Sequence, residues 1–91
     1  MRAIVEDLQK GHVDRKLFTA NANSYLSDQA LADFRSSLAP LGRLKKVART
    51  SEQSRGGMTH RSYRAEFASK TMRLNTYVMP DGKYEQFMVE E

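Results

Sequence analysis

Apolar and polar residues alternate through the last third of the chain, residues 58–89, and this pattern predicts β-strands. In the segment Tyr-Arg-Ala-Glu-Phe, residues 63–67, the apolar side chains fall on one face and the charged ones on the other, which is the period of a half-buried strand. The sequence Pro-Asp-Gly at 80–82 marks a tight turn, because Gly adopts positive φ without a Cβ clash and Asp tolerates it. We therefore predict strands at 58–68, 72–78 and 83–89.

The segment Leu-Lys-Lys-Val-Ala-Arg-Thr at 44–50 predicts one more strand. Its lysines are typical of a sheet edge, because a charged side chain resists pairing with the strand of another molecule. Residues 51–57 contain the pair Gly56 and Gly57 and predict a flexible loop. A phosphate-cradling function does not suit that loop, since a strand and not a helix N-terminus follows it.

Helical spacing is confined to the first forty residues. Ile4, Val5 and Leu8 predict a first helix at 2–10, and Gly11 stands where a left-handed cap ends a helix. Asp14 can cap a second short helix at 14–21.

A third helix is predicted at 28–38. Ser27 is a good N-cap, and Leu31, Phe34 and Leu38 follow at intervals of three and four to form one apolar stripe. Pro40 disfavours helical geometry in the residue before it, so the helix should stop near Leu38.

The order of these elements predicts an α+β fold. Helices come first and strands after, and the connections are too short for crossover helices, so the strands should form an antiparallel sheet. We expect short N-terminal helices packed on one face of a four-stranded antiparallel sheet. A chain of 91 residues has material for one core, so we expect a single domain, 1–91.

Two phrases carry a resemblance to a known group of folds. They are Gly-Gly-Met-Thr-His-Arg-Ser-Tyr-Arg-Ala-Glu-Phe, residues 56–67, and Leu-Asn-Thr-Tyr-Val-Met-Pro-Asp-Gly-Lys-Tyr-Glu-Gln-Phe, residues 74–87. With the element order, they resemble the cone-shaped α+β domains of the nuclear-transport-factor-like or cystatin-like group. More narrowly, they are similar to small C-terminal accessory domains of bacterial serine hydrolases or peptidases.

The resemblance covers about residues 27–89 and implies a cone-shaped domain, attached to or derived from a larger bacterial protein. Some members of the group are isomerases or dehydratases, which place an Asp or His base and a Tyr donor inside the cone. Complete members are longer than this chain, and a shared fold does not carry chemistry with it. No catalytic residue is therefore transferred to this sequence.

Composition excludes several kinds of chemistry. The chain has no cysteine, so disulfides, thiolate catalysis and Cys-ligated zinc are absent. His12 and His60 lie on different elements without ligand spacing, and we expect no metal site. No acid has a clear inward phase beside Tyr63, so we expect no catalytic residue, no cofactor and no enzyme, with an isomerase-like pocket as the alternative.

The first ten residues hold no apolar core of a signal peptide, and no apolar run approaches the length that spans a bilayer. We therefore expect a soluble chain without membrane insertion.

The net charge is +4, and the bases are concentrated in the middle of the chain. Between positions 43 and 73 there are nine bases and two acids, namely Arg43, Lys45, Lys46, Arg49, Arg55, Arg61, Arg64, Lys70 and Arg73 against Glu52 and Glu66. Such density is usually the solvated face of a sheet, but it also attracts nucleic acid. Binding of single-stranded nucleic acid, with Tyr77 and Tyr84 as stacking platforms, is the lowest of our alternatives.

The second face of the predicted sheet is the best candidate for function. If Ala65, Phe67, Leu74, Phe87 and Val89 face the helices, six other residues share the opposite side: His60, Arg64, Arg73, Tyr77, Tyr84 and Met88. Tyr, Met and Arg are enriched in protein interfaces. We therefore predict a non-enzymatic accessory or dimerisation domain that docks a protein partner or a second copy through this face.

An alternative function is the binding of a small apolar ligand in a pocket between helix and sheet. Four residues would line that pocket: Tyr25, Phe34, Tyr63 and Phe67.

Overall fold

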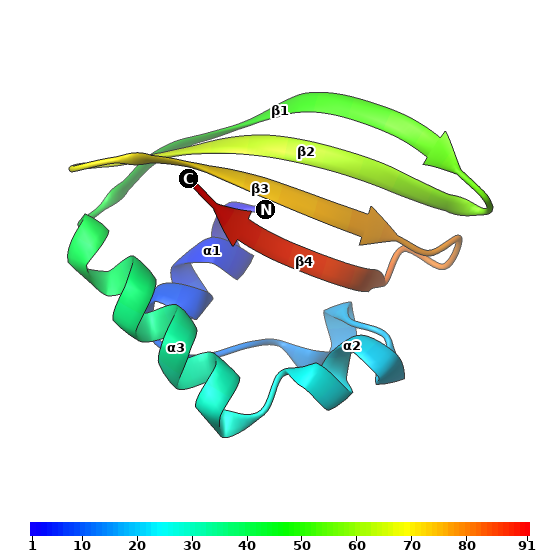
Figure 1. Ribbon diagram of the computed structural model, residues 1–91, viewed down its shortest axis with the longest axis horizontal. Helices are drawn as coiled ribbons and strands as arrows, with labels where there is room; N and C mark the ends of the chain where they lie inside the picture. The colour runs from blue at the N-terminus through cyan, green and yellow to red at the C-terminus, as the bar shows by residue number, and fades with distance from the viewer.

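The computed structural model describes residues 1–91 and contains three helices followed by a four-stranded sheet (Figure 1). The helices are α1 (Arg2–Gln9), α2 (Ala20–Tyr25) and α3 (Asp28–Leu38). The strands are β1 (Leu44–Arg55), β2 (Met58–Phe67), β3 (Thr71–Val78) and β4 (Tyr84–Glu90). They lie in the order β1-β2-β3-β4 and every neighbouring pair is antiparallel. The α+β fold class predicted from the sequence is therefore confirmed.

Side-chain caps begin two of the helices. The Ser27 hydroxyl accepts a hydrogen bond from the Ala30 amide at 3.1 Å at the start of α3, and the Thr19 hydroxyl accepts one from the Ala22 amide at 3.0 Å at the start of α2. These bonds satisfy amides that have no partner within a helix. None of the helices has the length and apolar character needed to cross a membrane.

The second predicted helix, 14–21, is wrong. Residues Arg15–Leu17 form one turn of 3₁₀ helix, and α2 begins only at Ala20. The break falls at Phe18 and Thr19, where the chain is extended and the Thr19 amide donates to the Tyr84 carbonyl at 3.0 Å. A pairing with β4 that is distant in sequence therefore overrides local helical preference at this point.

The flexible loop predicted at 51–57 is also wrong. Strand β1 continues to Arg55, which pairs with Met58, so the turn consists of Gly56 and Gly57 alone. Both glycines have positive φ, 54° and 87°, as a two-residue hairpin turn that matches strand twist requires. The result is a long β1–β2 hairpin that projects beyond the helices (Figure 1).

The core lies between the helices and one face of the sheet, which we call the inner face. All three helices are on that side, and none covers the opposite side, which we call the outer face (Figure 1). The buried cluster joins residues from the helices, from Phe18 and from the sheet: Ile4, Val5, Leu8, Phe18, Ala22, Leu31, Leu38, Leu44, Ala65, Phe67 and Leu74. Phe87 and Val89 of β4 pack against it. The helices therefore leave the outer face as the broad sheet surface open to other molecules.

Candidate functional site

An aromatic pair lies on the two central strands of the outer face, near the end of the sheet formed by the β1–β2 turn. His60 of β2 and Tyr77 of β3 are directly opposite each other, with ring centroids 4.9 Å apart. Gln53 of β1 and Gln86 of β4 complete the same cross-strand row. Aromatic side chains at this separation attract each other beyond the area they bury. The pair therefore forms an aromatic cluster among mostly polar side chains of this face.

Met88 of β4 is 50% exposed in the neighbouring row, where it is opposite Asn75. Asn75 accepts a hydrogen bond from the Ser62 hydroxyl at 2.8 Å and donates one to the Glu90 carboxylate. The polar groups beside the methionine are thus satisfied by one another.

Two arginines face each other one row further on. Arg64 of β2 is directly opposite Arg73 of β3, and neither forms an ion pair with a side-chain carboxylate. Arg73 donates instead to the backbone oxygen of Glu91 at 3.0 and 3.2 Å. Like charges directly opposite on a sheet repel each other. An acidic group from another molecule would relieve this repulsion.

Five of the six predicted interface residues lie on the outer face, and Tyr84 does not. A bulge in β4 places Tyr84 opposite Val78, whereas Gln86 is opposite Tyr77. The extra residue reverses the alternation at the start of the strand. Tyr84 therefore packs on the inner side, 5.7 Å from the ring of Phe18 and 5.9 Å from that of Phe87.

This position changes the chemistry of Tyr84. Burial raises the pKa of its phenol, and the neighbouring Tyr63 hydroxyl raises it further. The side chain thus behaves as a core residue with a polar tip and not as a surface contact.

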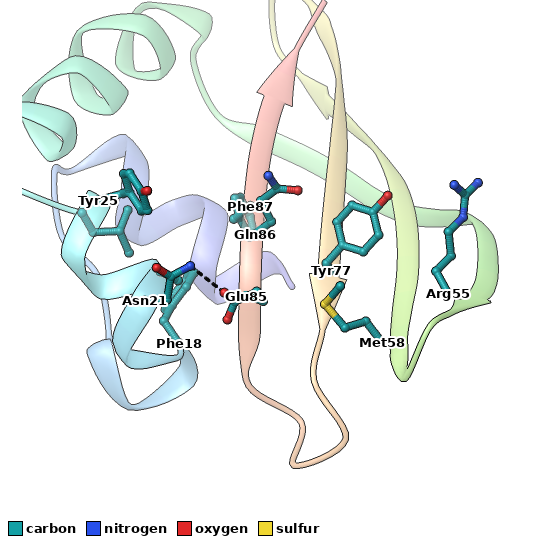
Figure 2. Close-up of a pocket in the computed structure, with 11 residues that line it drawn as sticks. Phe18, Asn21, Tyr25, Arg55, Met58, Tyr77, Glu85, Gln86 and Phe87 are labelled. Carbon is teal, nitrogen blue, oxygen red and sulfur yellow. Dashed lines mark hydrogen bonds between the residues drawn. The ribbon is translucent and has the colours of Figure 1, made fainter.

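A half-open groove of about 730 Å³ lies along β4. Figure 2 shows Tyr25 of α2 on one side of β4 and Tyr77 and Met58 on the other. Seven of the eleven lining residues are hydrophobic, namely Phe18, Ala22, Tyr25, Leu26, Met58, Tyr77 and Phe87. Tyr25 is 75% exposed, so the groove is bordered by an aromatic side chain that is free to contact a ligand.

Glu85 is the acidic residue of this groove. Its carboxylate accepts hydrogen bonds from the Thr19 hydroxyl and the Asn21 amide, both at 2.6 Å (Figure 2 shows the second). These two donors lower the pKa of Glu85, because they stabilise the charged form. The groove therefore keeps a negative charge at a defined position beside α2.

The four residues predicted to line an apolar pocket do not come together in one. Tyr25 borders the groove, but Phe67 is buried in the core, and Phe34 and Tyr63 pack against it. The space expected between helix and sheet is filled by α1, whose Ile4, Val5 and Leu8 are all buried. The remaining groove residues come from segments that alternation alone does not bring together.

The basic residues between positions 43 and 73 do not form one continuous positively charged surface. Arg61 and Arg49 both bind the carboxylate of Glu52, at 2.6 and 3.3 Å. The Arg61 hydrogen bond is the main reason that the pKa of Glu52 is lowered. Arg64 and Arg73, by contrast, share the outer face without an ion-pair partner.

No group of three or more His, Asp and Glu side chains is arranged to hold a metal ion.

Comparisons with models of known families, with curated proteins and with solved structures found no match to this chain.

Proposed function

We propose that this protein is a non-enzymatic interaction domain that dimerises through the outer face of its sheet. The observation that carries the proposal is the contact between the tilted rings of His60 and Tyr77, on the central strands of a face that no helix covers. Aromatic residues near the centre of an interface commonly supply most of its binding energy. Met88, half exposed one row away, adds apolar area to the same contact.

The charges on this face favour a second copy of the chain as the partner. Arg64 and Arg73 form no ion pair with a side-chain carboxylate, and the same face carries the acids Glu66 and Glu90. A two-fold axis brings the same patch of both copies together. Offset pairing about such an axis places the arginines of one copy against the acids of the other.

The proposal is tested by measuring mass in solution as a function of concentration, for the natural protein and for Tyr77→Ser. We expect a dimer that Tyr77→Ser weakens by about tenfold or more, the scale of losing one central aromatic contact. Tyr25→Ser is the matched control, because Tyr25 is equally aromatic and more exposed but lies on α2, away from the face. A natural protein that stays monomeric at about millimolar concentration contradicts the proposal.

A second candidate function is binding of a small apolar ligand in the groove along β4. Its volume of about 730 Å³ lies within the range of roughly 300–1,000 Å³ common for ligand sites. A ligand that binds only the folded state raises apparent stability, by about 2.7 kcal/mol at a hundred times its Kd. Thermal unfolding with a panel of uncharged aromatic and aliphatic compounds tests this candidate. The absence of any shift in Tm across the panel counts against it.

A further inference from the structure

The two edges of the sheet differ in how they are protected. Strand β1 carries Lys45, Lys46 and Arg49 and has two register shifts along its pairing with β2. In addition, the Arg2 guanidinium donates to the carbonyls of Leu44 and Lys45, both at 2.8 Å. Charged side chains, bulges and covering groups are the means by which proteins keep edge strands from pairing with other chains.

Strand β4 has few of these protections. It contains no Lys, Arg or Pro, and its sequence includes the apolar run Phe87, Met88 and Val89. Outside its pairing with β3, the hydrogen bonds of its backbone are limited to one, made by the Tyr84 carbonyl. Residues 86–90 therefore present free donors and acceptors along the edge, which is a template for another strand.

The chain itself shows that this edge accepts an added strand. Phe18 forms a parallel bridge with Tyr84, and the Thr19 amide donates to the Tyr84 carbonyl at 3.0 Å. This pairing stops after one bridge because α2 begins at Ala20 and leads the chain away. The groove along Glu85, Gln86 and Phe87 begins where the pairing stops.

The charge of the edge selects the chemistry of a partner. Strand β4 carries Glu85 and Glu90 and no base. If a second copy paired antiparallel with Phe87 opposite Met88, Glu85 of one copy would be opposite Glu90 of the other. Like charges in that position are destabilising, so a segment with basic residues at its ends fits this edge better than a second β4 does.

We propose that β4 binds an extended peptide segment of a partner protein, which adds to the sheet as a further strand, places alternate apolar side chains in the groove and sets a Lys or Arg near Glu85. Main-chain hydrogen bonds supply affinity in this mode of recognition, and pockets for alternate side chains supply specificity. The main-chain groups of this site lie at the edge of the sheet, although Tyr77 and Gln86 of the outer face also line the groove.

The test uses a blocked synthetic peptide, Lys-Val-Thr-Val-Thr-Val-Lys, titrated into the isotope-labelled full chain while backbone amide shifts are recorded. We expect the largest shifts in β4 and α2. Gln86→Lys adds a positive charge at this edge and should weaken binding by about tenfold or more. Gln53→Lys is the matched control, because Gln53 ends the same cross-strand row on the opposite edge, and it should change affinity less than about twofold.

Two further peptides separate strand addition from other contacts. A peptide with alternate amides N-methylated lacks the donors that a strand needs and should not bind, and one with Glu in place of Lys should bind more weakly. Equal binding of the N-methylated peptide, shifts centred on β1, or no shifts up to about millimolar peptide would each overturn the proposal. The dimer has its own readout, the solution mass of Tyr77→Ser, so failure of one proposal is distinguished from failure of the other.

Discussion

The Thr19 hydroxyl donates a hydrogen bond of 2.6 Å to the carboxylate of Glu85, 66 positions further along the chain. The same hydroxyl accepts the Ala22 amide and so begins α2. A helix of six residues is too short to persist by itself in water. One side chain thus starts the helix that forms one side of the groove and fixes it to the strand that forms the other.

We predict that Thr19→Val lowers the free energy of unfolding by about 1–2 kcal/mol through loss of the cap alone. The change should also increase amide hydrogen exchange throughout α2, because the bond to Glu85 is lost as well. Ser27→Ala removes a comparable cap from α3 without breaking a bond to the sheet, so it should leave exchange in α2 unchanged. Urea unfolding and hydrogen exchange measure the two effects. Equal protection of α2 in both variants would refute the link.

The lowered pKa of Glu85 predicts a loss of stability in acid. Hydrogen bonds from Thr19 and Asn21 stabilise the folded carboxylate, so the folded state binds fewer protons than the unfolded state. The contribution is present above the unfolded pKa and is lost as the pH falls through the lower, folded pKa. Glu85→Gln should therefore show a shallower decline between about pH 5 and pH 2 when urea midpoints are measured across that range. Parallel profiles for the two proteins would show that the bonds do not favour the charged form.

Tyr84 predicts the opposite dependence in alkali. Burial raises its folded pKa above the ordinary value of 10.0, so the folded state keeps the phenolic proton longer than the unfolded state does. Stability is complete below the unfolded pKa and is lost as the pH rises through it towards the folded pKa. Tyr84→Phe should reduce this alkaline loss, and phenolate absorbance should show one late-titrating tyrosine that the variant lacks. An unchanged absorbance titration would contradict the buried position of Tyr84.

Gly42 and Gly56 predict different costs for the same substitution. Both have positive φ, but a Cβ at Gly42 would meet the Cβ of Ala68 at 2.9 Å, whereas nothing lies within 4 Å of one at Gly56. Gly42→Ala should therefore cost at least about 1 kcal/mol more than Gly56→Ala, the cost of a local overpacking. Urea unfolding of both variants measures the difference. Equal losses would mean that the loop after α3 relaxes without penalty.

Several features of this fold could be predicted from the spacing of residues that are close together in the sequence. The cap at Ser27, the stripe of Leu31 and Leu38, and the alternation around Ala65 each depend on residues a few positions apart. Hydrophobic burial then assigns each apolar stripe to the core. The placement of His60, Tyr77 and Met88 on one face follows from the same period of two.

The predictions from sequence were wrong where a contact between distant segments determines the local structure. By the alternation of the sequence, Tyr84 should lie on the same face of the sheet as Gln86 and Met88. The bulge opposite Val78 places it on the inner face instead. The groove joins Tyr25, Met58 and Phe87, which no periodicity connects. Residues 51–55 are polar and carry no strand signal, yet pairing with β2 extends β1 through them.

Periodicity along the chain is enough to predict the class of fold, the order of its elements and most of the outer face, because helical and strand periods are properties of neighbouring residues. The tertiary structure alone decided where α2 begins, which side Tyr84 occupies and where the groove lies. The start of α2 depends on the contact of Thr19 with Tyr84 and Glu85, and the side of Tyr84 depends on the bulge in the pairing of β4 with β3. In both cases pairing between distant segments outweighs local preference.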